Sequence, residues 1–129
     1  MTQEHKELLL KDLCARLPYG VKCRYQHIQY VENGKIININ MFGIVNVDGH
    51  IKDICDIKPY LIPLSSMKEE QKKELHDKLI ELELKALNGE ISRIEAVSFE
   101  TDYYLKNHFD YRGLIEKGMA IDATGLNIY

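Results

Sequence analysis

Residues 21–57 read VKCRYQHIQYVENGKIININMFGIVNVDGHIKDICDI, and apolar side chains alternate with polar ones through most of this stretch. A period of two is typical of half-buried β-strands. The pair Asn33-Gly34 favours the type I′ turn of a two-residue hairpin loop. We therefore expect a hairpin that turns at Asn33-Gly34, with Tyr30 facing Ile37 on an apolar side of the sheet.

Further signals extend this hairpin into a three-stranded sheet. The apolar residues change face near Gly43, which predicts a bend or bulge there. Asp48-Gly49 has the composition of a second turn and leads into a third strand over residues 50–56. The result is an antiparallel meander with one strongly bent hairpin. Residues 58–64 contain two prolines, so we expect an extended connection there rather than a central strand.

Helical periodicity predicts four helices outside the sheet. They cover residues 3–17, 67–87, 101–107 and 111–117. The first follows Thr2 as its N-cap and stops at Pro18. Its expected buried face consists of Leu10, Leu13, Cys14 and Leu17. The long helix begins after a cap at Ser65 or Ser66 and ends at Asn88-Gly89.

Composition and charge fit one folded domain. The 129 residues are 45% hydrophobic and 29% charged, with a formal net charge of -3. These values exclude disordered, fibrous and membrane-spanning classes. We predict a single α+β domain over residues 1–129, with an N-terminal helix, the three-stranded antiparallel meander, a long helix and two short C-terminal helices. Residues 90–98 fit either a strand or irregular chain.

The sequence also limits which cellular compartment and which cofactors we expect. Neither a signal peptide nor an apolar run near the roughly 20 residues of a membrane span is present. The odd number and wide spacing of Cys14, Cys23 and Cys55 favour a reducing, cytoplasmic setting, with each thiol free, buried and inert. The histidines are too scattered to hold a metal, and His27 is expected to be a hydrogen-bonded surface residue. No glycine-rich phosphate loop occurs, so we expect no metal and no cofactor.

The densest polar cluster is His108, Asp110, Tyr111 and Arg112. In a catalytic or ligand-binding interpretation, Asp110 orients His108 as a general base, and Arg112 holds an anionic group. In the structural interpretation, which we favour, Asp110 caps the last helix and His108 ends the helix before it. Arg112 is then solvated or paired with a carboxylate.

Two apolar features point to protein contacts. Tyr103 and Tyr104, with Phe99, Phe109 and Tyr111, form either an exposed patch for a partner or a cluster packed on the long helix. The second half of that helix is apolar on two faces, so it is either deep in the core or shared with a partner. The residues expected to mediate self-association are Leu79, Ile80, Leu84 and Leu87.

Three segments carry a resemblance to a known family. They are residues 6–23, KELLLKDLCARLPYGVKC, residues 56–67, DIKPYLIPLSSM, and residues 107–118, NHFDYRGLIEKG. Together they resemble a family of small uncharacterised proteins from phages and mobile elements of gut bacteria. The resemblance implies an accessory protein that works inside a bacterial cell. It implies no activity and no site residues.

We therefore expect a small non-catalytic accessory protein that acts by protein–protein interaction, for example on a host or defence protein. Its partner is another protein or a second copy of the chain. The alternative is a small enzyme or ligand-binding protein that uses His108, Asp110 and Arg112. Nucleic acid is not an expected partner, because an acidic chain without a Lys/Arg cluster lacks the required electrostatic footprint. A weak nucleic-acid binder would show an affinity that falls steeply with salt.

Overall fold

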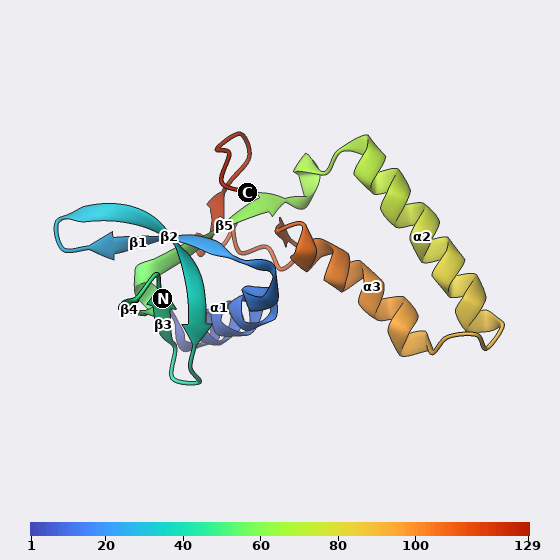
Figure 1. The fold of residues 1–129 in the computed structure, drawn as a ribbon, viewed down its shortest axis with the longest axis horizontal. Helices are drawn as coiled ribbons and strands as arrows, with labels where there is room; N and C mark the ends of the chain where they lie inside the picture. The colour runs from blue at the N-terminus through green and yellow to red at the C-terminus, as the bar shows by residue number, and fades with distance from the viewer.

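The computed structural model describes residues 1–129 except for the side chain of His27, so the expectation for that side chain lies outside the described residues. The described chain contains the α-helices α1 (Gln3–Arg16), α2 (Glu69–Leu87) and α3 (Arg93–Lys106). Its strands are β1 (Lys22–His27), β2 (Tyr30–Ile39), β3 (Ile44–Val47), β4 (His50–Asp53), β5 (Ile57–Pro63), β6 (Phe109–Asp110) and β7 (Ile121–Asp122). Figure 1 shows the strands and α1 gathered in one body, from which α2 and α3 project side by side. We call this antiparallel pair of helices the arm.

The strands form one mixed sheet in the order β4-β3-β2-β1-β5-β6, and β7 also pairs with β5. The strands β6 and β7 run parallel to β5, whereas the other pairs are antiparallel. The α+β class and the N-terminal helix are confirmed. The expected meander is correct only in part: β1 to β4 pair antiparallel in chain order, but the sheet has seven strands, and residues 57–63, expected as a connection, form a central strand. Pro59 faces Cys23 of β1 and precedes both parallel ladders, which begin at Tyr60 or later, whereas Pro63 is the last residue of the strand and lies opposite Asp110.

The first hairpin turns five residues earlier than expected. Tyr25 of β1 faces Glu32 of β2, which places the loop at Ile28-Gln29. Asn33-Gly34 therefore lies inside a strand, and the predicted register is wrong. Gly34 allows close approach instead of a turn, because a Cβ there would lie 2.7 Å from Val47 Cγ1. This packing requirement has overridden the local preference of the Asn-Gly pair.

The second half of the expected meander is correct in part. Asp48-Gly49 forms the turn between β3 and β4, with positive φ at both residues, as predicted. Gly43 lies in the loop between β2 and β3, and the irregular register falls around Ile37 instead. Because of the new register, Tyr30 and Ile37 are exposed rather than paired on an apolar face.

The helix α1 has the expected ends but a different buried face. Thr2 Oγ1 accepts a hydrogen bond from the His5 N–H, and the helix stops before Pro18. The buried residues are Leu9, Asp12, Leu13 and Arg16. This set is displaced by one residue, or about 100° around the helix, from the predicted face. The prediction counted only apolar residues, and an aspartate and an arginine complete the true face.

The helix α2 begins two residues later than expected. The backbone N–H of Lys68 donates to Gln71 Oε1 (2.9 Å), so the Gln71 side chain provides an acceptor for this backbone donor at the start of the helix. Ser66, predicted as a cap, instead lies with its hydroxyl 3.2 Å from the Thr124 hydroxyl. The predicted end at Asn88-Gly89 is confirmed.

Residues 90–117 differ most from the prediction. The single helix α3 covers both the ambiguous segment and the expected short helix at 101–107. It starts after Ser92, whose hydroxyl accepts a hydrogen bond from the Glu95 N–H. Residues 111–117 form turns in place of the second short helix.

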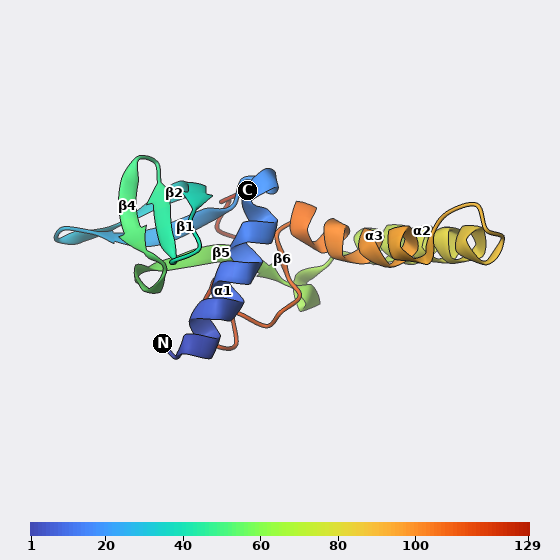
Figure 2. The same ribbon diagram turned by 90° about the horizontal axis from the view of Figure 1, so that it is seen from below.

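The main core lies between the sheet and α1, whereas the arm contributes little to it. The core includes Leu9, Leu13, Val21, Cys23, Tyr25, Ile36, Val45, Val47, Ile54, Ile57, Leu61, Leu114, Met119 and Ala120. A smaller cluster of Met67, Leu75 and Phe109 lies at the base of the arm. Leu75 is the only buried residue of α2, and Leu105 is the only one of α3. Figure 2 shows the arm edge-on, extending away from the sheet and from α1. None of the helices in the described chain combines the length and the hydropathy that crossing a bilayer requires.

Candidate functional site

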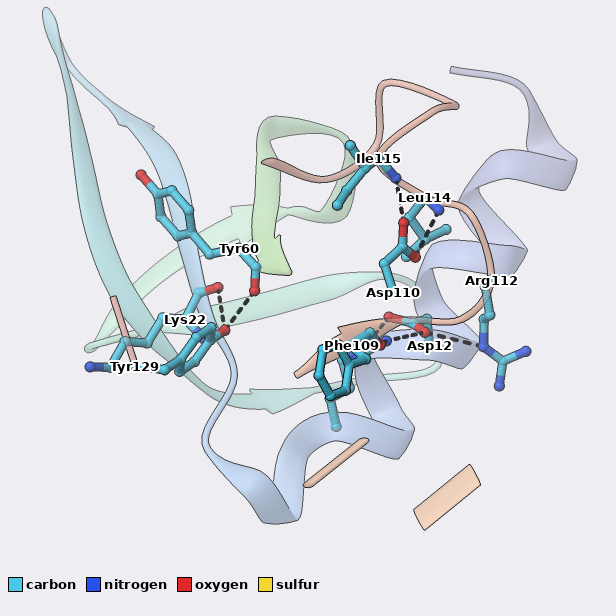
Figure 3. A network of polar contacts seen from close by, with 10 residues as sticks. Asp12, Lys22, Tyr60, Phe109, Asp110, Arg112, Leu114, Ile115 and Tyr129 are labelled. Atoms are coloured by element: carbon cyan, nitrogen blue, oxygen red, sulfur yellow. Dashed lines mark hydrogen bonds and ion pairs between the residues drawn. The ribbon is translucent and has the colours of Figure 1, made fainter. Parts of the chain in front are cut away.

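A buried ion-pair network joins α1 to the segment after α3. Arg16 Nε donates to Asp12 Oδ2 (2.6 Å), and both side chains are completely buried. Arg16 Nη2 also donates to the Phe109 carbonyl (2.7 Å). Arg112 Nε donates to the other oxygen of Asp12 (3.1 Å), as Figure 3 shows. One carboxylate therefore binds two guanidinium groups and ties together two distant segments of the chain.

Asp110 fixes the turn that follows β6. Its carboxylate accepts hydrogen bonds from the Leu114 and Ile115 N–H groups, both at 2.9 Å (Figure 3). The side chain caps this turn even though no helix continues from it. Its oxygens are thus committed to the backbone.

His108 packs against the other end of the chain. Its ring stacks on Tyr129, with centroids 3.5 Å apart and an interplanar angle of 8°. Burial, together with the positive charges of Arg16 and Lys22, lowers the pKa of His108 to about 4. The Tyr129 hydroxyl donates to the Tyr60 carbonyl (2.7 Å) and accepts from the Lys22 N–H (3.0 Å), as in Figure 3. A neutral His108 therefore helps to hold Tyr129 against β1 and β5.

The predicted polar cluster is divided among these separate contacts. Within the described part of the chain, no hydrogen bond or ion pair joins His108, Asp110 and Arg112 to one another. Tyr111 lies beneath Arg112, whose guanidinium carbon is 4.9 Å from the ring centre. The geometry stabilises the fold and does not place an oriented base beside an anion-binding arginine.

The aromatic residues pack at the base of the arm. Tyr104 stacks on Tyr111, with centroids 5.8 Å apart, and meets Phe109 edge to face at 6.5 Å. Phe99 and Tyr103 contact each other and pack against the cluster that contains Leu75 of α2. Of the two arrangements expected for these residues, packing on the long helix is the one observed. Tyr103 and Tyr104 are only partly exposed.

The far half of the arm exposes large aliphatic side chains from both helices. They are Ile80, Leu84, Leu87, Ile94 and Val97, with exposed fractions between 45% and 78%. A groove of about 470 Å³ runs between the two helices on this half. It is lined by Leu79, Glu83, Ala86, Leu87, Arg93, Ala96, Val97 and Glu100. This surface, the arm groove, combines apolar side chains of both helices with the charged residues Glu83, Arg93 and Glu100.

The sequence prediction found the α2 side of this surface and missed the α3 side. Of the four residues proposed for self-association, Leu79 is partly buried in the groove, and Ile80, Leu84 and Leu87 are exposed. Val97 and Arg93 were missed because residues 90–98 were not assigned to a helix. The signal was present, since Ser92 followed three residues later by Glu95 has the form of a capping box.

The three cysteines differ in their exposure to solvent. All three cysteines are free; Cys23 is buried as expected, whereas Cys14 and Cys55 are exposed, contrary to the prediction. Burial and the nearby charge of Asp48 raise the pKa of Cys23 to about 12, so its thiol stays protonated. Among the described side chains, no three potential metal ligands lie together.

The chain matches no protein-family model, no curated protein and no solved structure.

Proposed function

We propose that this chain is a non-catalytic accessory protein that acts by binding protein through its arm. The observation that carries the proposal is the row of large aliphatic side chains on both helices of a projecting hairpin. Water contact with such side chains is unfavourable, and a contiguous exposed apolar patch typically marks an interaction site. The arm also stands clear of the body, so a partner can reach it without displacing the core.

The resemblance of residues 6–23, 56–67 and 107–118 supports a setting within a bacterial cell, in a protein from a phage or mobile element. A reducing cytoplasm suits the exposed free thiols of Cys14 and Cys55. A host or defence protein is the kind of partner that this setting supplies. We do not propose catalysis by His108, Asp110 and Arg112, because each is engaged in a different structural contact.

The proposal is tested by affinity capture from a bacterial lysate with the tagged full-length chain. In the arm variant L87K/V97E, both substituted side chains are exposed in the native protein, and the new residues suit their helices. The control is D102K, which changes an exposed residue about 140° around α3 from Val97.

We expect a protein, or an untagged copy of the chain, to be retained by the native bait and by D102K but lost with L87K/V97E. Circular dichroism confirms that all three baits are folded. Equal recovery by the three baits, or no specific recovery by any, would contradict the proposal.

A further inference from the structure

Four basic side chains lie together on the solvent-facing side of the sheet. They are Lys22 and Arg24 of β1, Lys35 of β2 and Lys58 of β5. All four are exposed, whereas the residues that alternate with them in β1, Cys23 and Tyr25, are buried in the core on the other side. We call this set of four residues the basic face. It belongs to the body of the protein and not to the arm.

The register of the strands sets these cations directly opposite one another. Lys22 faces Lys35 across β1 and β2, and Arg24 faces Lys58 across β1 and β5. The Cβ atoms of opposed residues lie about 5 Å apart, and like charges placed in this way destabilise a sheet. The two pairs are two residues apart along β1, which is about 7 Å. Four positive charges are therefore concentrated in two adjacent rows.

The charges of the basic face are not paired with carboxylates. Within the described residues, none of the four side chains takes part in an ion pair. Lys22 Nζ donates to the Ile128 carbonyl (2.8 Å), and Arg24 Nε donates to the Tyr60 hydroxyl (3.4 Å). Both cations have further N–H donors, so these contacts do not exhaust them.

Two acidic residues border the basic face without neutralising it. Asp48 Oδ2 accepts a hydrogen bond from the backbone N–H of Lys35 (3.1 Å). The same oxygen lies 2.7 Å from the position that a Cβ on Gly34 would take, which is on the side of β2 opposite the Lys35 side chain. Asp56 lies at the other end of the face, beside Lys58. Four cations against two carboxylates leave the surface positive.

The surface is hollowed at both rows. A hollow of about 350 Å³ is lined by Lys22, Lys35 and Asn33, among others. A second hollow, of about 220 Å³, is lined by Arg24 and Lys58. Asn33 faces Arg24 across β1 and β2, so the two hollows adjoin. One ligand can therefore contact cations of both rows.

The extent of the charge favours a compact anion over an extended one. The next row on the same face consists of Gln26 and Val31, which are uncharged. The basic rows therefore do not continue into the groove of charge that a nucleic-acid strand follows. A chain of phosphate groups carries several negative charges within a short length, and lysine and arginine are the side chains that bind phosphate.

We propose that the basic face binds a compact ligand that carries a chain of phosphate groups, supplied by a nucleotide or by a free oligophosphate. Lys22 and Lys35 contact one end of the chain, and Arg24 and Lys58 contact the other. The bound phosphates relieve the repulsion between the opposed cations. This site is separate from the arm groove, so ligand binding here does not depend on the proposed protein partner.

An NMR titration of the ¹⁵N-labelled full chain with sodium tripolyphosphate tests the inference in about 20 mM salt, where screening is weak. We expect saturable shifts of backbone amides in β1, β2 and β5. K35Q and K58Q each remove one exposed charge from a different row, and each should weaken binding about threefold. The double variant K35Q/K58Q should weaken it about tenfold. The matched control K73Q removes the same charge from an exposed lysine of α2 and should bind like the native chain.

ATP, titrated in the same way, distinguishes the two sources of the phosphate chain. An affinity above that of tripolyphosphate indicates a nucleotide, and an affinity no higher indicates a free oligophosphate. The absence of saturable shifts at the basic face overturns the inference, as does equal affinity of the native chain and K35Q/K58Q. An oligothymidylate or a polyglutamate peptide that binds this face more tightly than both phosphate compounds would assign it to an extended polyanion and also overturn the inference.

Discussion

The loop of the first hairpin holds an isoleucine in a conformation that suits glycine. Ile28 has a φ of 51°, and Gln29 completes the two-residue loop. Positive φ at the first loop position is typical of a type II′ turn, where glycine is preferred. A β-branched residue is strained there because its Cβ crowds the following carbonyl. The substitution I28G should therefore stabilise the protein.

The magnitude follows from two opposing terms. Relief of the left-handed conformation contributes about 1–2 kcal/mol. Glycine offsets about 0.5–1 kcal/mol of this gain, because its greater conformational freedom stabilises the unfolded chain. The side chain of Ile28 is 80% exposed, so little buried apolar area is lost. The net gain in unfolding free energy is about 0.5–1 kcal/mol.

Urea denaturation followed by far-UV circular dichroism measures this gain. The midpoint for I28G should rise with an unchanged slope. The matched control is I37G, which changes an exposed isoleucine within β2 and should lower stability by about 0.5–1 kcal/mol. A hairpin turning at Asn33-Gly34 would instead put Ile28 inside a strand, and I28G would then be destabilising. A midpoint for I28G below that of the native chain would refute the observed register.

Three further predictions concern the core and the polar contacts. The pKa of His108 is about 4 in the folded protein, so as the pH falls the unfolded chain takes up the proton first. The free energy of unfolding should therefore decrease as the pH falls from about 6.5 to about 4. The expected loss is about 1–2 kcal/mol after allowance for partial solvent screening. H108N should flatten that part of a stability–pH profile, and an unchanged profile would exclude His108 as its source. D12A leaves the fully buried Arg16 without its carboxylate and should cost about 3–5 kcal/mol in thermal or urea unfolding, whereas a loss below 1 kcal/mol would mean that the pair is solvated. G34A should cost about 1–3 kcal/mol through its contact with Val47, and the double variant G34A/V47A should be more stable than the sum of the single changes predicts.

The features that were predicted correctly depend on neighbouring residues. The Thr2 cap, the end of α2 at Asn88-Gly89 and the Asp48-Gly49 turn each arise from one or two side chains and the local backbone. Such local signals do not depend on contacts with distant segments of the chain. Strand pairing does depend on those contacts, so it is harder to predict from the sequence.

The errors have the same physical origin. Asn33-Gly34 favours a turn locally, but Gly34 is used where Val47 approaches the strand too closely for a Cβ. Residues 57–63 contain two prolines, yet the parallel strands from the end of the chain make them central.

The candidate site was likewise found in part. The apolar face of α2 was visible from its periodicity, whereas its α3 counterpart exists only because the Ser92 cap starts a helix in a segment with no clear period. The buried face of α1 could not be found from hydrophobicity, because Asp12 and Arg16 neutralise each other only in the folded chain.

The pairing of β5 with β6 has a consequence for how this protein can vary. Ile62 and Phe109 are direct partners in the sheet, so the chain leaves the body and comes back at adjacent points. The tip of the hairpin could be lengthened, trimmed or exchanged without separating these two strands. The arm can therefore change in length or sequence while the strands that anchor it, and the body they belong to, keep their structure.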